Sequence, residues 1–505
     1  MNARKIVGSV FFNYLGSICV SLTGFVATPS LLHSLGKGSF GAWALIGAIM
    51  GYASLLDLGI GLTVMRMVAQ RAHLSDRHEL NRIASTGLVM YSAIGLVALA
   101  AGAAAAPFVG HAFNLSGPHL GEFTTAFVIM VATISLTFPA GLYTGINQGF
   151  GHYAQQNVIV IVQSLAATAI AVVVVKLGGG LVSLAIVNFS VAAAAFAAKI
   201  AYAARTFRIV PSPRRFDRRV ARTVIGVSAW MFVVNVAARV IWDVDAIVVG
   251  AVLSTVAVAQ YAVALGPATA IRRLTDQFNS VSLTAASSLH AQGQHEGLRR
   301  LLIEATRVVT LFVCPFLVLF AVWGTDFLRL WVGPSLEGSA ATLVALVFGI
   351  LALSVQATAT QVLLALGRQR IMSVAAVLEA CVNLTLSIVL AHHIGILGVA
   401  LGTTIPTSVA AFGFYIPYAA RLVGLPLQRI YRRLVLPVAI SALAYGALRW
   451  APADVEFGSL VEFMCFAGAF VGVLIVAALL LDREERGTYL QLAHSVGRRV
   501  LRAPA

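Results

Sequence analysis

The ionisable side chains inside apolar segments are the residues of this chain best suited to binding chemistry. A charged residue at the centre of a membrane span costs about 2.5–3.5 kcal/mol on insertion scales, so it normally faces protein or water. The residues of this kind are Asp57, Arg239, Asp243, Asp245, Arg272, Arg273, Asp276 and Glu379. They are the candidates for holding a charged ligand or ion inside the bilayer.

Three arginines among them suit a diphosphate group. These are Arg239, Arg272 and Arg273, and the planar guanidinium fork matches phosphate oxygens. Asp276 follows Arg272 by four residues and Arg273 by three, so on a helix either arginine can neutralise it, but not both. One positive charge is then left for a diphosphate. The competing interpretation is that these arginines lie nearer the membrane surface and extend to it.

Three aspartates are candidates for binding a coupling proton or sodium ion: Asp243, Asp245 and Asp276. Arg239 and Asp243 are four residues apart and share a helix face. Asp245 points about 200° away from Asp243 around the same helix. An internal ion pair, with Asp245 as a partner for another helix, explains the same pattern equally well.

Two further acids and one lysine are expected to be mainly structural. Asp57 could pair with Arg66 across the inner end of its helix, and Glu379 lies in the first half of a later span. Both are lower-ranked cavity residues, because intramembrane acids are often paired. Lys199 lies near enough to a span end for its ammonium group to reach the surface.

No other chemistry is indicated. The chain has no Walker A phosphate loop, and its four cysteines lie singly in apolar runs without the spacing of a zinc site. The adjacent His392 and His393 point to different helix faces and are expected to cap a span end. We therefore expect no catalytic residue, no metal and no cofactor.

The composition requires lipid as the solvent for most of the chain. Of 505 residues, 59% are hydrophobic and 11% are charged, and the mean hydropathy is +0.90, whereas soluble domains carry about 25% charged residues. Only helices and closed barrels satisfy the backbone in lipid. Continuous apolar runs of about 20 residues indicate helices. The prediction is an all-α, polytopic membrane protein.

Fourteen membrane spans are predicted, with both termini in the cytoplasm. Their approximate ranges are 8–32, 39–62, 83–106, 122–142, 154–175, 181–204, 223–252, 256–280, 305–323, 339–363, 372–392, 399–420, 434–450 and 459–481. In this orientation the inside segments hold 27 of the 35 Lys and Arg residues and the outside segments hold four. The asymmetry follows the positive-inside rule and explains the net charge of +16 without a nucleic-acid partner.

The two halves of the chain repeat each other in outline. Gly117-Pro118 recurs as Gly333-Pro334, and Gly149 recurs as Gly367. The predicted organisation is an N-terminal six-helix bundle at 1–204, a basic cytoplasmic linker at 205–222, a C-terminal six-helix bundle at 223–420, two extra helices at 421–481 and a cytoplasmic tail at 482–505. Two bundles of the same orientation are typical of transporters that handle substrate between their halves.

Several local phrases occur in a characteristic order: LGKGSFG at 35–41, LDLGIG at 56–61, FLRLWVG at 327–333, LGRQR at 366–370 and GILGVALG at 395–402. With the plan of six, six and two spans, they resemble the polysaccharide-export branch of the multidrug/oligosaccharidyl-lipid/polysaccharide exporter superfamily. The resemblance covers nearly the whole chain and depends on the order and spacing of the phrases.

The resemblance implies a flippase, not an enzyme. Such a protein would move an undecaprenyl-diphosphate-linked oligosaccharide across the bacterial inner membrane, by alternating access, for O-antigen or a related surface polysaccharide. The expected partners are this lipid-linked oligosaccharide, membrane lipids, a coupling proton or sodium ion and polysaccharide assembly proteins. A multidrug or cation antiporter of the same superfamily is the alternative. A membrane glycosyltransferase or polysaccharide polymerase is less favoured, because the longest predicted outer loop, about 107–121, carries Glu122 at its edge and no acid/base pair.

Overall fold

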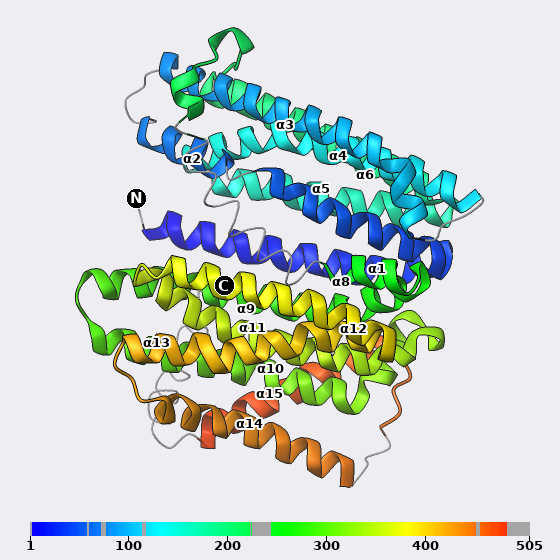
Figure 1. Ribbon diagram of the computed structural model, residues 1–505, viewed down its shortest axis with the longest axis vertical. Coiled ribbons are helices and arrows are strands. Elements are labelled where there is room, and N and C mark those ends of the chain that lie inside the picture. The colour runs from blue at the N-terminus through cyan, green and yellow to red at the C-terminus, as the bar shows by residue number, and fades with distance from the viewer. Residues whose placement is uncertain are drawn as a thin grey trace, which may run out of the picture. The chain divides into compact units, whose positions relative to one another are not determined.

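The computed structural model of the protein describes residues 3–57, 60–71, 77–113, 118–222, 224, 244–450 and 455–481. In these ranges the chain is helical with short connections and contains no strand (Figure 1). The predicted all-α class is therefore confirmed. The predicted tail at 482–505 and two candidate residues, Arg239 and Asp243, lie outside the described residues.

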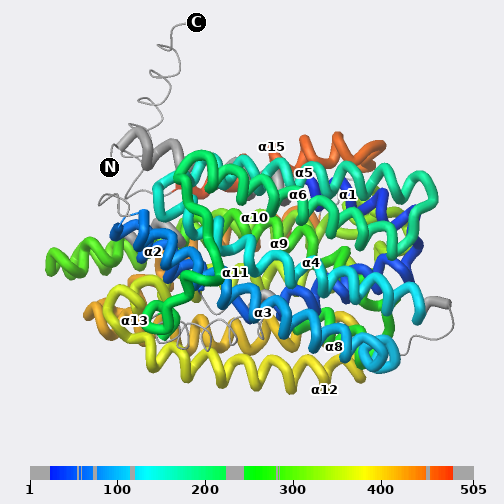
Figure 2. Tube along the Cα trace, turned by 90° about the horizontal axis from the view of Figure 1, so that it is seen from above, coloured from blue at the N-terminus to red at the C-terminus, as the bar shows by residue number. Residues whose placement is uncertain are grey.

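The first part of the chain forms six helices. They are α1 (Ala3–Ala53), α2 (Ile60–Arg71), α3 (Arg77–Ala112), α4 (Pro118–Gly149), α5 (Tyr153–Lys176) and α6 (Leu181–Phe207), with a 3-10 turn, η1, at Ser54–Asp57. Helices α3 to α6 run alongside one another in two perpendicular views (Figure 1, Figure 2). Each contains one of the predicted spans from 83–106 to 181–204 within its bounds.

The later part of the chain continues with helices of similar length. They are α8 (Asp245–Val252), α9 (Thr255–Ala291), α10 (His295–Val332), α11 (Ala340–Ala365), α12 (Gln369–Ala410), α13 (Ile416–Leu422), α14 (Leu427–Trp450) and α15 (Leu460–Leu481). A 3-10 turn, η4, lies at Pro334–Ser339, and a π-helical turn, η5, at Ala411–Tyr415 joins α12 to α13.

The chain divides into two compact units. The first comprises Met1–Gly266 and Ala376–Thr403, and the second comprises Pro267–Ala375 and Thr404–Ala505. The boundary passes through α9 and α12, so these units differ from the predicted six-helix bundles at 1–204 and 223–420. The two-bundle repeat therefore stays a prediction.

Two long helices each join two predicted spans through a bend at glycine. Gly36 interrupts α1 with a φ of 76°, and Gly395 interrupts α12 with a φ of 61°. Glycine adopts positive φ without steric penalty. After the second bend the two parts of α12 pack against each other so tightly that a Cβ on Gly402 would lie 2.4 Å from Ser387 Oγ.

Nine helices in the described part of the chain are long and apolar enough to cross a membrane. One of them is the continuous segment Gln369–Leu422 of 54 residues, which at 1.5 Å per residue is long enough for two crossings. Helix α1 and the charged helix α9 are not among the nine, and most of the predicted seventh span lies outside the described residues. The chain is thus a multi-pass membrane protein, and the count of fourteen stays a prediction.

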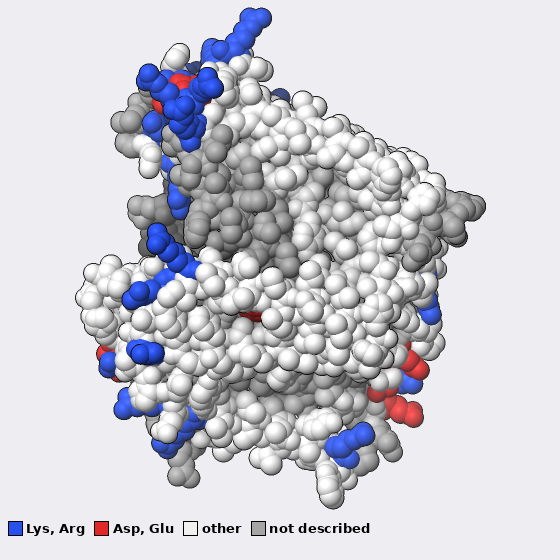
Figure 3. Space-filling view, in the orientation of Figure 1, with Lys and Arg blue, Asp and Glu red and all other residues white. Residues whose placement is uncertain are grey.

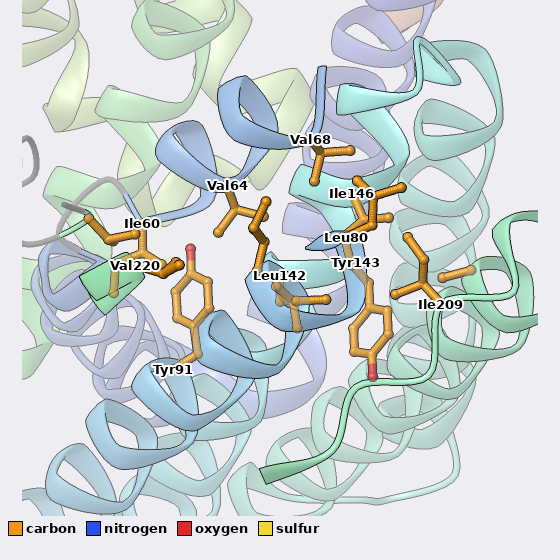
Figure 4. Packing of buried hydrophobic residues seen from close by; sticks show 14 of the residues in the cluster. Ile60, Val64, Val68, Leu80, Tyr91, Leu142, Tyr143, Ile146, Ile209 and Val220 are labelled. Atoms are coloured by element: carbon orange, nitrogen blue, oxygen red, sulfur yellow. The ribbon is translucent and has the colours of Figure 1, made fainter. Parts of the chain in front are cut away.

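A buried apolar cluster unites α2, α3 and α4 with the linker that follows α6 (Figure 4). The labelled side chains of this cluster are Ile60, Val64, Val68, Leu80, Tyr91, Leu142, Tyr143, Ile146, Ile209 and Val220. Small residues let the helices approach, since a Cβ on Gly145 of α4 would lie 2.7 Å from the carbonyl oxygen of Gly61 in α2. Close contact through small residues is typical of helix packing in lipid.

The linker itself is held against α3. After Arg208, in a left-handed conformation, the backbone is non-helical apart from a 3-10 turn, η3, at Pro213–Arg215. Asp217 then caps the helical residues 218–222 by accepting hydrogen bonds from the backbone N–H groups of Arg219 and Val220. The predicted hydrophilic linker is therefore an ordered segment with its own cap.

Asp217 also forms an ion pair with Arg82 of α3 at 3.1 Å. The backbone N–H of Arg219, the N–H of Val220 and the Arg82 guanidinium lower the pKa of this carboxyl group below its usual value. Because the pKa of Asp217 is lower in the folded chain, its carboxylate stabilises the fold fully above the unfolded pKa of about 3.9. This stabilisation is lost as the pH falls through the lower folded pKa. Asp217 therefore stays ionised at neutral pH.

The glycine contact between α2 and α4 should be essential for packing. Gly145→Ala places a methyl group against backbone atoms that cannot move aside, and overpacking of this kind costs about 1–3 kcal/mol. We expect a lower thermal unfolding midpoint in detergent for the purified protein. The control is Gly47→Ala in α1, where a Cβ meets nothing within 4 Å; equal midpoints for the two variants would contradict this account.

Candidate functional site

Asp245 is the more enclosed of the two predicted ion-coupling acids that the structure describes, Asp245 and Asp276. It lies in the first turn of α8 with 2% of its surface exposed. The hydroxyl of Tyr261 in α9 donates a hydrogen bond to Oδ2 at 2.5 Å. The hydroxyl of Thr403 in α12 lies 2.8 Å from Oδ1 and 2.9 Å from Oδ2. Three helices of the first unit thus converge on one buried carboxylate, which takes the role of partner for other helices.

A row of polar residues on α12 extends from this region. Glu379, Asn383 and Ser387 are spaced by four residues, so they share one helix face, and all three are buried. Ser387 lies against Gly402, the residue before Thr403. The predicted cavity residue Glu379 is therefore inside the first unit, about 12 Å along α12 from Ser387. It is enclosed by protein and does not face lipid.

The charged group on α9 has a different environment. Arg272 Nε lies 3.7 Å from Asp276 Oδ2, and these side chains are 33% and 51% exposed. Arg273 is also partly exposed. Of the two pairings that the spacing allowed, the structure therefore contains the one between Arg272 and Asp276. All three residues belong to the second unit and keep accessible surface within a predicted span.

The adjacent face of α9 is anchored to α11 by buried polar contacts. Ser354 donates a hydrogen bond to Thr275 at 2.8 Å, and Thr358 donates one to Asn279 at 3.0 Å. These contacts orient α9, because a rotation about its axis would bury hydroxyl and amide groups without partners. They fix the orientation of the neighbouring Arg272–Asp276 face, which lies about 60° around α9 from the anchored face.

Asp57 has a partner other than the one predicted. Its carboxylate, at the end of η1, accepts a hydrogen bond from the hydroxyl of Tyr91 in α3. The predicted pairing with Arg66 is wrong within the described residues. The reason is that Asp57 lies in the 3-10 turn η1 and so lacks the α-helical geometry that the prediction assumed. The hydrogen bond between Asp57 and Tyr91 thus ties η1 to α3, which favours a structural role for Asp57.

A polar chain across α4, α5 and α6 was not foreseen as a unit. Lys199 Nζ donates to Thr144 Oγ1 at 3.1 Å, and Gln156 Nε2 donates to the same oxygen at 3.2 Å. Asn147 Nδ2 donates to Gln156 Oε1 at 3.2 Å. The Lys199 ammonium group was expected to reach the surface but has a protein partner. In the sequence, this polar chain was indicated by the three-residue spacing of Thr144 and Asn147, which places both on one face of α4.

Tyr261 and Thr403 were also missed as partners of Asp245. A tyrosine or threonine inside an apolar span gives no indication by itself of which distant helix it contacts. Hydroxyl groups 16 and 158 residues from Asp245 in sequence could be assigned to it only after the helices were packed.

The sequence pattern of the polysaccharide biosynthesis protein family matches residues 6–288, more than half of the chain. This chain belongs to that family. A putative O-antigen transporter of Shigella flexneri is 22% identical over 405 residues, covering 79% of this chain and 94% of the relative. The uncharacterized membrane protein EpsK of Bacillus subtilis (strain 168) is 23% identical over 488 residues, covering 92% and 93%.

Two solved structures share the fold of this chain. The lipid II flippase MurJ, in an inward closed conformation, aligns with a TM-score of 0.73 at 14% identity over 96% of this chain and all of that one. An inward-facing multidrug resistance MATE transporter of the MOP superfamily aligns with a TM-score of 0.65 at 14% identity over 86% of this chain and 96% of its own. The resemblance to a polysaccharide-export family that the sequence indicated is confirmed by the family match, and the solved structures show a shared fold. The family member is a membrane transporter or flippase and not an enzyme.

The hydroxyl contact of Tyr261 should stabilise the Asp245 site. Tyr261→Phe removes one donor from a buried carboxylate, which costs about 1–3 kcal/mol. A fall in the thermal unfolding midpoint of the purified protein is expected. Tyr445→Phe, at a tyrosine 41% exposed on α14, is the matched control and should unfold like the unmodified chain. A Tyr261→Phe variant as stable as that control would show that the contact adds nothing.

Proposed function

We propose that this family member flips an undecaprenyl-diphosphate-linked oligosaccharide across the bacterial inner membrane for surface polysaccharide synthesis. The observation that carries the proposal is the charged group on α9, where two arginines and one aspartate stay accessible within a predicted membrane span. Family membership and the relative described as a putative O-antigen transporter support it. The chain acts in this proposal with both termini in the cytoplasm.

The chemistry of α9 suits a diphosphate anion. Arg272, Arg273 and Asp276 together carry a net charge of +1. Removing this charge from water costs free energy, and binding an anion offsets that cost. A guanidinium group can bind two phosphate oxygens at once. The Arg272–Asp276 pair separates when the diphosphate competes for the arginine. Arg239 is assigned to the same ligand from its sequence position.

Asp245 is the leading site for a coupling ion. Its carboxylate meets the hydroxyl oxygens of Tyr261 and Thr403, and oxygen ligands suit hard cations. Carboxyl groups within membranes also relay protons in transporters. Binding of a cation or proton at Asp245 changes the charge at the meeting point of α8, α9 and α12. Such a ligand drives alternating access if it binds one of the two states more tightly. Asp243 and Asp276 are secondary candidates.

A multidrug or cation antiporter remains the second candidate function. The similarity to an inward-facing multidrug transporter favours it, as does the buried carboxylate Asp245. The net positive charge of the α9 group favours the anionic lipid instead. A strain lacking the gene discriminates between the two: loss of surface polysaccharide with unchanged drug sensitivity supports the flippase, and the reverse result supports the antiporter.

Removing both α9 arginines should stop transport of the anionic lipid. In a deletion strain expressing Arg272→Gln with Arg273→Gln, we expect surface polysaccharide to fall at least about tenfold, a loss equivalent to about 1.4 kcal/mol or more. The control is Arg368→Gln with Arg370→Gln, two exposed arginines at the start of α12. Immunoblotting checks that all variants are equally abundant. Polysaccharide at the control level in the α9 variant would refute the assignment of these arginines.

Neutralising Asp245 should uncouple transport from the ion gradient. Asp245→Asn keeps the size of the side chain and removes the charge that a cation or proton requires. In proteoliposomes with a fluorescent undecaprenyl-diphosphate sugar, an imposed sodium or proton gradient should accelerate flipping by the unmodified protein and not by the variant. The same dependence in Asp245→Asn and the unmodified protein would place the coupling site elsewhere.

A further inference from the structure

The linker between α6 and the following predicted span forms a strap on the first unit. We use linker strap for residues 209–217. Three of its backbone N–H groups donate to side chains of α3: Val210 to Asn81 Oδ1 at 2.9 Å, Ser212 to Ser85 Oγ at 3.0 Å, and Asp217 to Thr86 Oγ1 at 3.0 Å. The acceptors are Asn81, Ser85 and Thr86, and all three are buried.

These contacts place the linker strap along a membrane helix. Helix α3 is a candidate membrane span beginning at Arg77, and α6 is another, ending at Phe207. The acceptors Asn81 to Thr86 cover roughly 8 Å of α3. The strap therefore leaves α6 and returns beside the first three turns of α3. Buried N–H groups of non-helical backbone need acceptors, and α3 supplies them here.

Apolar side chains fix both ends of this segment. Ile209, at the start of the strap, and Val220, just after it, are buried in the cluster with α2, α3 and α4 (Figure 4). Arg82 adds an ion pair to Asp217. Six separate contacts therefore determine which side of the strap faces the bundle and which side faces outward.

The outward side is strongly basic. All seven arginines of residues 205–222 are exposed: Arg205, Arg208, Arg214, Arg215, Arg218, Arg219 and Arg222. Figure 3 shows Lys and Arg side chains gathered where Figure 1 draws this segment in green beside the start of α3. The segment has one carboxylate, Asp217, and it is engaged by Arg82 and by backbone N–H groups. The arginines are therefore left with a large positive excess.

Apolar side chains are exposed among the arginines. Val210 is 64% exposed and Phe216 is 45% exposed, and Phe216 lies between Arg215 and Asp217 in the chain. Aromatic and aliphatic groups interspersed with basic residues are the pattern of surfaces that lie at the lipid headgroup boundary.

We propose that the linker strap and the arginines flanking it form a preformed docking surface for anionic phospholipid headgroups. The arginines bind the headgroup phosphates, and Val210 and Phe216 insert at the boundary between headgroups and acyl chains. Each basic residue near an anionic leaflet contributes attraction that falls off within a Debye length. The three backbone hydrogen bonds to α3, called the clamp below, order the strap before lipid binds. Lipid binding therefore loses less conformational entropy.

The test measures lipids that remain bound to the purified full-length protein. The protein is equilibrated in mixed micelles with equal amounts of phosphatidylglycerol and phosphatidylethanolamine, and retained lipids are counted by native mass spectrometry. The unmodified protein should retain phosphatidylglycerol preferentially. The variant Arg214→Gln, Arg215→Gln, Arg218→Gln, Arg219→Gln should lose this preference at least about tenfold, because four basic contacts with the anionic lipid are removed.

The control removes the same charge elsewhere. Arg368→Gln, Arg370→Gln, Arg429→Gln and Arg432→Gln neutralise four exposed arginines outside the linker and should change the preference less than about twofold, because the docking surface keeps its charge. An equal loss in the two variants, or no loss in either, overturns the proposal. Preferential retention of farnesyl diphosphate over phosphatidylglycerol at the strap also overturns it, because the surface would then receive an isoprenoid diphosphate instead.

A second variant tests whether the surface is preformed. Asn81→Leu with Ser85→Ala and Thr86→Val removes the three acceptors and keeps all seven arginines. Hydrogen exchange at residues 210–217 should rise, and the preference for phosphatidylglycerol should fall about threefold, since a mobile strap must be ordered on binding. If the triple variant does not fold, Thr86→Val alone serves. Faster exchange with an undiminished lipid preference would show that the clamp has no part in docking.

Discussion

Lipid offers no hydrogen bonds, and every other feature of this structure depends on that constraint. Each polar group within the bilayer has to find its partner inside the protein. Regular helices meet the requirement for most of the backbone. Where the helix is interrupted, side chains from a neighbouring helix supply the missing partners: Tyr91 reaches Asp57 at η1, and Asn81, Ser85 and Thr86 receive the backbone of the linker strap. These polar residues of α3 thus serve as partners for η1 and for the linker strap, which lie beside it.

The same constraint sorts the charged residues into environments with different chemical uses. Asp245 is enclosed and held by hydroxyl groups, which suits a small ion that can enter a closed site. Arg272 and Asp276 are paired yet accessible, which suits a large anionic ligand that displaces the carboxylate. The arginines of the linker remain at the surface, where the cost of desolvation is small. A single average of charge over the chain hides this division.

Much of the framework follows from local patterns. The apolar runs at 83–106, 122–142, 154–175 and 181–204 each became one helix, because a run of this length in lipid has no other way to satisfy its backbone. The spacing allowed either Arg272 or Arg273 to pair with Asp276, since all three lie on one helix, and the structure contains the Arg272 pair. The predicted pairing of Asp57 with Arg66 was wrong, because Asp57 lies in the 3-10 turn η1 and bonds to Tyr91. Lys199 was read as extending to the surface, and the structure gives its ammonium group a partner in Thr144.

Composition, apolar run length and the distribution of basic residues were enough to establish a polytopic helical membrane protein, and the order of its glycine-rich phrases indicated the transporter superfamily. These properties depend on solvation, which acts on each segment separately. The partners of Asp245, the clamp under the linker and the polar row on α12 came only from the packed helices. Contacts between residues as distant as Asp245 and Thr403 depend on which helix faces meet, and apolar segments of similar composition do not encode that choice in any local pattern.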